Sequence, residues 1–112
     1  MDNIDFATLP DAEAARLMAE MDGLSPRPYT TSLDAAVGWL ERMGLRWEKR
    51  IRNFDNVEFV LVYMEVEMPE FAKQRGLQWR GIECVITDSC PTSRALCNAG
   101  WQAVKAREAA NG

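Results

Sequence analysis

Polar side chains that could bind an anion gather at the starts of two predicted helices. Free amide groups at a helix N-terminus attract anions such as phosphate, and nearby hydroxyl groups and an Arg add further donors. If the two starts lie at the same end of the sheet, they form a nucleotide-sized pocket. Plain helix capping is the simpler interpretation, because Ser and Thr are good caps. The candidate ligand-binding residues are Tyr29, Thr30, Thr31, Ser89, Thr92, Ser93 and Arg94.

No catalytic set is recognisable in the sequence. The chain has no His, so the commonest general base near neutral pH is missing. Cys90 precedes Pro91 at a predicted helix start, but a nucleophilic thiol also needs an activating neighbour, and a small residue filling that position is the simpler interpretation. Cys84 and Cys97 fall on apolar stripes and are predicted core residues. We therefore expect a protein that is not an enzyme.

The sequence predicts no cofactor and no metal site. Three cysteines without a C-x-x-C pair and without any His lack a fourth zinc ligand. Glu65 and Glu67 share one strand face and could hold a cation, but a solvated strand end explains them better. The seven Gly are scattered, so no glycine-rich phosphate loop is formed.

Aromatic and basic side chains crowd an irregular segment, residues 67–80, between two predicted strands. Trp and Arg are enriched in protein interfaces, and loops commonly carry function. The alternative is that the two aromatic rings cover the sheet locally, and both interpretations stay open. The candidate interface residues are Phe71, Lys73, Arg75, Trp79 and Arg80.

The charge balance limits the class of partner. The chain has 13 Lys and Arg against 17 Asp and Glu, a net charge of −4, which disfavours binding to duplex nucleic acid. Residues 42–52 form a basic cluster, best explained as charge that protects a sheet edge from pairing. No stretch reaches the roughly 20 apolar residues of a membrane helix, and the acidic N-terminus does not resemble a signal peptide. We expect a cytoplasmic protein with three free thiols.

Three segments have the apolar spacing of helices, and three alternate as strands do. The second helix is the clearest, because Thr31 and Asp34 resemble a capping box, its apolar stripe begins at Leu33, and Gly44 ends it. The last helix has a predicted core face of Leu96, Cys97, Gly100, Trp101 and Val104. The predicted elements are helices over residues 11–23 and 31–44, strands over 45–51, 57–66 and 82–87, and a helix from about 91 to 106.

The element order α-α-β-β-β-α predicts one mixed α/β (α+β) domain over residues 1–112. Short connections between the strands predict a three-stranded antiparallel sheet. The segment 57–66 is apolar on both faces, so it must be covered on both sides. This indicates a three-layer α/β/α sandwich. Residues 1–7 and 107–112 are expected to fray.

Three short stretches carry a resemblance to a known family. They are Met-Asp-Gly at residues 21–23, Pro-Tyr-Thr-Thr-Ser-Leu at 28–33 before a helix with Trp39, and Cys-Pro-Thr-Ser-Arg-Ala-Leu-Cys-Asn-Ala at 90–99. In type, order and spacing they are similar to the phage ABA sandwich domain of small phage and prophage proteins, over residues 11–106. Ser32 stands where that family often has Asp, and the segment 67–80 looks longer than its usual connection. The resemblance implies an α/β/α layered fold and a phage origin.

The expected function is binding without catalysis. By analogy with phage accessory proteins, the predicted partner is a host protein, for instance a bacterial immune complex that the chain would block. The alternative is a protein that sequesters a nucleotide or similar anion between the two helix starts. A homodimer stays open, because a three-stranded sheet has two edges.

Overall fold

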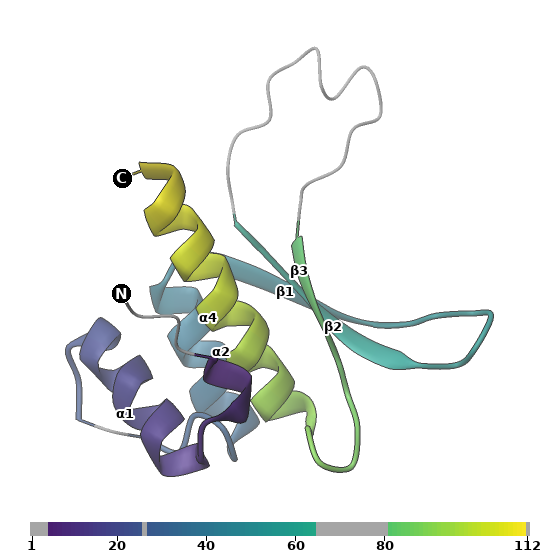
Figure 1. The fold of residues 1–112 in the computed structure, drawn as a ribbon, viewed down its shortest axis with the longest axis horizontal. Coiled ribbons are helices and arrows are strands. Elements are labelled where there is room, and N and C mark those ends of the chain that lie inside the picture. Colours follow the sequence, from purple (N-terminus) through teal and green to yellow (C-terminus); the bar gives the residue numbers. More distant parts are fainter. Residues whose placement is uncertain (1–4, 26, 65–80, 112) are drawn as a thin grey trace.

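The computed structural model describes residues 5–25, 27–64 and 81–111 of the chain. In this part, three α-helices pack on a three-stranded antiparallel sheet (Figure 1), which confirms the predicted α+β fold and the order α-α-β-β-β-α. The elements are a 3-10 helix η1 (Phe6–Thr8), α1 (Asp11–Asp22), α2 (Leu33–Arg42), β1 (Leu45–Ile51), β2 (Glu58–Met64), β3 (Gly81–Val85) and α4 (Thr92–Asn111).

The sheet has the order β1-β2-β3, so β2 is central and β1 is an edge strand. Trp47 lies opposite Val62, and Val62 lies opposite Ile82. Side chains alternate across a strand, so these three residues share one face of the sheet. Val60 and Val62 on this face are fully buried and belong to the same core as the helices. The helices therefore pack against this face of the sheet.

The helices α2 and α4 contact each other and the same face of the sheet (Figure 1). Helix α4 is covered on opposite sides. Its residues 93–101 are all buried between the sheet and the remaining helical elements. We expected one helical layer on each face of the sheet. Among the described residues, the helices cover one face only, and the other face presents the half-buried side chains of Phe59, Leu61 and Tyr63.

The helix ends follow local chemistry, with one correction at α2. Gly23 ends α1 in the left-handed conformation, at φ 71°, which Gly adopts without strain. The cap of α2 is Ser32, whose hydroxyl accepts a hydrogen bond from the Ala35 amide at 3.4 Å. The prediction that Thr31 caps this helix is wrong by one residue. Leu33, predicted to start the apolar stripe, is 44 % exposed.

Phe6 and Arg107, near the two ends of the described chain, each contact a partner distant in sequence. The Phe6 ring stacks on Trp101 of α4, with centroids 4.8 Å apart and planes at 12°. At the other end, Arg107 Nη1 donates to the Met43 carbonyl oxygen at 2.6 Å. These contacts tie η1 to α4 and α4 to the end of α2, and the fraying of residues 1–7 and 107–112 stays a prediction.

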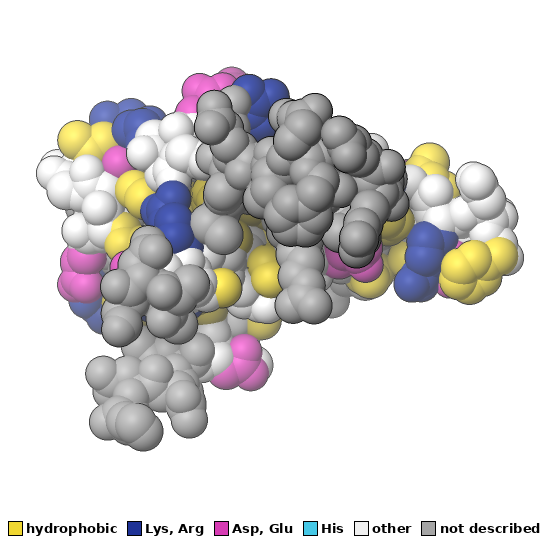
Figure 2. Space-filling model, turned by 90° about the horizontal axis from the view of Figure 1, so that it is seen from above, with side chains coloured by type: hydrophobic (Ala, Val, Ile, Leu, Met, Phe, Trp, Pro, Cys, Tyr) yellow, Lys and Arg dark blue, Asp and Glu magenta, His cyan; other side chains and the backbone are white. Residues whose placement is uncertain are grey.

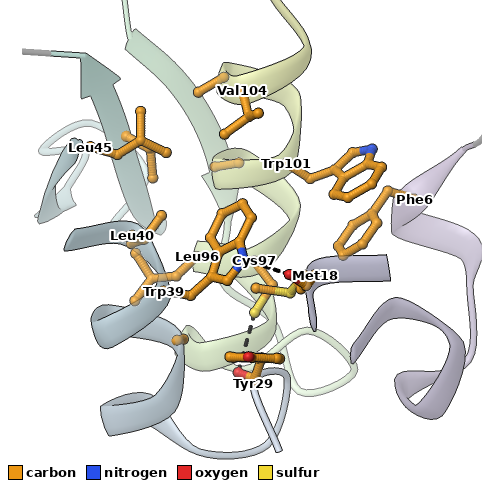
Figure 3. Close-up of a cluster of buried hydrophobic side chains, with 14 of the residues drawn as sticks. Phe6, Met18, Tyr29, Trp39, Leu40, Leu45, Leu96, Cys97, Trp101 and Val104 are labelled. Carbon is orange, nitrogen blue, oxygen red and sulfur yellow. Dashed lines mark hydrogen bonds between the residues drawn. The ribbon is translucent and has the colours of Figure 1, made fainter. Parts of the chain in front are cut away.

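The core is built around large side chains from each helix (Figure 3). Trp39 of α2 is fully buried, and its Nε1 donates to the Met18 carbonyl oxygen of α1 at 2.9 Å. The predicted core face of α4 is confirmed, since Leu96, Cys97 and Trp101 are buried in the same cluster as Trp39. A buried indole N–H needs such a partner, so this bond fixes α1 against α2.

Candidate functional site

The two helix starts that the sequence singled out lie side by side in the structure. Ser93 Oγ, in the first turn of α4, donates to the Thr30 carbonyl oxygen at 2.8 Å. One turn further along, Cys97 Sγ donates to the Tyr29 carbonyl oxygen at 3.2 Å (Figure 3). Tyr29, Thr30 and Ser93 are buried by this contact. These groups therefore join α4 to the segment before α2.

Arg94 is the most heavily engaged polar side chain of this region. Its Nη2 donates to the carbonyl oxygens of Phe6 and Leu9 at 2.8 and 2.9 Å, and its Nε donates to Asn98 Oδ1 at 3.1 Å. Nη1 forms an ion pair with Asp11 at 2.9 Å. The residue is 7 % exposed. An anionic ligand at Arg94 would have to displace Asp11 and backbone carbonyls of the chain itself.

The other candidate ligand-binding residues are not gathered into one polar group. Thr31 and Ser89 are exposed, and Thr92 is half-buried. The Ser89 hydroxyl lies 3.2 Å from the Thr87 hydroxyl, within the turn before α4. The two helix starts do lie side by side, but their buried donors bond to the chain itself and stabilise its packing. This favours capping and structural roles over an anion site.

A second polar cluster joins the end of α1 to α2. The Asp22 carboxylate accepts hydrogen bonds from Arg42 Nε at 2.8 Å and from Arg42 Nη2 at 2.6 Å. The Tyr29 hydroxyl donates to the same carboxylate at 3.2 Å. Hydrogen bonding to Arg42 lowers the pKa of Asp22, and burial, followed by the charge of Asp22, raises the pKa of Tyr29. The cluster is a satisfied structural ion pair with no group left over for acid–base work.

Two of the three thiols have a raised pKa, whereas the pKa of a nucleophilic thiol is lowered. Burial raises the pKa of the Cys97 thiol to about 12. Burial, and then the neighbouring Cys90, raises the pKa of Cys84 to about 11. Reactive cysteines have a lowered pKa and a cationic neighbour. Among the described residues, no group of three or more metal-ligating side chains is found, and Glu65 and Glu67 lie outside them.

The basic cluster at residues 42–52 is largely neutralised by neighbouring acids. Arg42 pairs with Asp22, Lys49 with Glu58 at 3.4 Å, and Arg50 with Glu48 at 2.6 Å. These pairs lie along and beside the edge strand β1, as the interpretation of edge protection requires. The cluster does not present a row of unpaired cations to a polyanion.

The connection between β1 and β2 projects from the described part of the molecule (Figure 1). The hairpin extends away from the helices, at the right of Figure 1. Its turn is closed by two backbone hydrogen bonds, from the Arg52 amide to the Val57 carbonyl at 2.9 Å and from the Asn56 amide to the Arg52 carbonyl at 2.8 Å. Asn56 has φ 55°, a left-handed conformation that Asn tolerates better than most residues.

Phe54 stands at the tip of this hairpin and is 84 % exposed. The Arg52 guanidinium lies 5.3 Å from the centre of the Phe54 ring and pairs with Asp55 at 2.9 Å. Figure 2 shows hydrophobic and basic side chains together at the same far end of the molecule. Ile51, just before the turn, is 56 % exposed. We call Ile51, Arg52 and Phe54 the hairpin tip.

The hairpin tip was not among the residues singled out from the sequence. The predicted interface residues Phe71, Lys73, Arg75, Trp79 and Arg80 all lie outside the described residues. One pattern could have indicated the tip, namely a Phe inside the turn cluster Asn-Phe-Asp-Asn at residues 53–56. Turns are usually polar, so a large apolar side chain there has no core to enter and must face solvent or a partner.

Comparisons with known proteins do not assign this chain to a family. No family model matches the chain, and no curated protein and no solved structure matches it. The resemblance to the phage ABA sandwich family therefore stays a prediction. In the described part of the chain, the helices are all too short or too polar to span a membrane.

Proposed function

We propose that this chain is a non-catalytic accessory protein of a phage that acts by binding a host protein. The observation that carries the proposal is the 84 % exposure of Phe54 at the end of an ordered hairpin. Large aromatic side chains dominate protein interfaces when a partner buries them. In the free protein, the Phe54 ring gains almost no stabilisation from its own chain, so a binding role explains its place at the tip.

The geometry of the turn supports this role. Asp55 holds the tip twice, through its ion pair with Arg52 and through Oδ1, which accepts from the Val57 amide at 3.2 Å. A turn whose backbone is held in place before binding loses less conformational entropy when its residues are buried. Arg, the other residue type common at binding hot spots, lies beside the ring at Arg52. The hairpin therefore offers a pre-formed anchor for an apolar pocket.

The rest of the described surface offers weaker support for other functions. The anion-binding alternative requires Arg94 and Ser93, and both already bond to the chain itself. An enzymatic function requires an activated group, and the buried Cys97 thiol and the Asp22 carboxylate are held in unreactive states. The phage origin, the cytoplasmic location and a target in bacterial immunity rest on the resemblance and on analogy.

A comparative pull-down tests the proposal. Wild type, Phe54→Ser and Leu33→Ser would be immobilised and exposed to bacterial lysate at micromolar concentration. Leu33 is a matched control because it is also exposed, at 44 %, but lies on α2. We expect a host protein to be retained by wild type and Leu33→Ser and lost with Phe54→Ser. Retention of no protein by wild type would refute a binding function.

A further inference from the structure

Two of the three free thiols lie next to each other beneath the start of α4. Cys84 is on β3, opposite Val60, on the face of the sheet that packs against α4. Beyond β3 the chain turns back, because Thr87 and Cys90 exchange two backbone hydrogen bonds of 2.9 and 3.1 Å. This return brings Cys90 against the same core as Cys84, and burial, followed by the neighbouring Cys90, raises the pKa of Cys84. Both side chains are half-buried, so part of each is exposed to solvent.

A side chain of α4 holds the pair in place. Asn98 Nδ2 donates to Cys90 Sγ at 3.7 Å, and Asn98 partly offsets the rise in the pKa of Cys84. Arg94 Nε donates to Asn98 Oδ1 at 3.1 Å, so the Asn98 amide turns its NH₂ group toward Cys90 Sγ. The Cys90 amide is fixed in turn by the Thr87 hydroxyl at 3.0 Å. The two sulfur atoms are thus positioned from β3, from the turn and from α4.

We propose that Cys84 and Cys90 form an intramolecular disulfide when the protein meets a peroxide. The Cys90 sulfur attacks the peroxide, so that an S–O bond forms, the O–O bond breaks and one water leaves. The second sulfur then attacks the sulfenic acid, so that the S–S bond forms, the S–O bond breaks and a second water leaves. Two thiols are oxidised and one hydrogen peroxide is reduced to two waters.

The reaction has a clear dependence on pH and a clear structural consequence. The thiolate is the attacking species, and the pKa of Cys84 is raised to about 11, so oxidation should accelerate as pH rises above neutral. The bond would tie β3 to the turn that precedes α4. It would limit local opening of the helix start that carries Ser93 and Arg94, and it is independent of the function proposed for the hairpin tip.

The third cysteine, Cys97, is an internal control for the reaction. Cys97 is 1 % exposed, and its thiol donates to the Tyr29 carbonyl oxygen at 3.2 Å. Its hydrogen-bond partner, Tyr29, lies in the segment before α2. Peroxide that reaches the pair should therefore leave Cys97 unchanged.

Thiol counting and mass measurement test the proposal. The folded protein would be treated with hydrogen peroxide, quenched and denatured, in parallel as wild type, Cys84→Ser, Cys90→Ser and Cys97→Ser. We expect free thiols in wild type to fall from three to one, with a mass loss of about 2 Da that a dithiol reductant restores. Cys97→Ser should behave in the same way, whereas Cys84→Ser and Cys90→Ser should form no intramolecular bond.

Peptide mapping keeps the test decisive if a variant fails to fold. Cleavage after Arg80 and Arg94 places Cys84 and Cys90 on one peptide, residues 81–94, and leaves Cys97 on another. The 81–94 peptide of oxidised wild type should lose about 2 Da before reduction. Three remaining thiols, oxygen added to either cysteine in place of the bond, or disulfide-linked dimers would each overturn the proposal.

Discussion

The Arg94 guanidinium lies 5.3 Å from the centre of the Phe6 ring, so a single side chain of α4 holds the start of the chain in place. The same group bonds to Asp11, at the first residue of α1. Its partners are more than 80 residues away in sequence. One buried cation thus connects η1, α1 and α4.

Replacing Arg94 should therefore destabilise the fold. Arg94→Ala leaves the carbonyl oxygens of Phe6 and Leu9 without their donor, and we expect a loss of about 3 kcal/mol in the free energy of unfolding. Urea denaturation measures the change. The control is Arg16→Ala, because Arg16 pairs with Glu13 and Glu20 at the exposed surface of α1, where ion pairs contribute little. An Arg94→Ala variant as stable as wild type would contradict the structural role.

Two glycines in helices should respond in opposite directions to Ala. A Cβ atom at Gly100 of α4 would lie 2.6 Å from Leu40 Cδ2 and 3.1 Å from Trp39 Cζ3, and we expect overpacking to cost about 1–3 kcal/mol. At Gly38 of α2 the nearest atom is Arg42 Nη1, at 3.1 Å, at the far end of a side chain that bonds to Asp22 through Nε and Nη2 rather than through Nη1.

Gly38→Ala should therefore stabilise by about 0.5–1 kcal/mol, the usual gain of Ala over Gly inside a helix. Thermal and urea unfolding of both variants measure the two changes side by side. A stabilising Gly100→Ala substitution would mean that α2 and α4 are not packed as closely as described.

The Asp22 cluster gives a prediction in pH. Its pKa is lowered in the folded state by Arg42, so the carboxylate stabilises the fold above the pKa of the unfolded chain, about 3.9. This contribution is lost as pH falls through the lower, folded value. Asp22→Asn should cost about 1–2 kcal/mol near neutral pH, and the difference from wild type should shrink below about pH 3.9.

Urea unfolding of both proteins across the acid range measures this difference. Glu13→Gln is the control, because Glu13 also pairs with an Arg but lies at the surface, where solvent screens the interaction. A gap between wild type and Asp22→Asn that stays constant from neutral to acid pH would contradict the charge-based account.

The order of elements could be predicted because the residues that end the helices are recognisable in the sequence. Gly23 and Gly44 both adopt positive φ, at 71° and 73°, and both end helices as their type suggests. The alternation of Leu45 and Trp47 with charged residues correctly indicated β1. The capping residue of α2 was less certain, since Thr31 and Ser32 are adjacent hydroxyl residues and local pattern does not rank them.

The layering could not be predicted because β2 is apolar on both faces. Sequence alone does not say that Val60 and Val62 face the helices while Phe59 and Leu61 do not. The role of Arg94 was hidden for a similar reason. An Arg at a helix start resembles an anion receptor until partners such as Phe6, distant in sequence, are known. Long-range contacts decide both cases.

The hairpin tip carries the central claim, that the protein acts by binding another protein. Phe54 makes its one described ring contact with Arg52, so its replacement should leave stability almost unchanged while removing an interface anchor. This separation between folding and binding makes the residue a clean probe. Leu33, similarly apolar and exposed but on α2, controls for a general loss of surface hydrophobicity.

The most direct measurement is the dissociation constant of the retained host protein for wild type, Phe54→Ser and Leu33→Ser, determined by calorimetry on folded proteins. We predict that Phe54→Ser weakens binding about thirtyfold, equivalent to roughly 2 kcal/mol, and that Leu33→Ser binds within about twofold of wild type. Equal affinity of wild type and Phe54→Ser for that partner would contradict the account.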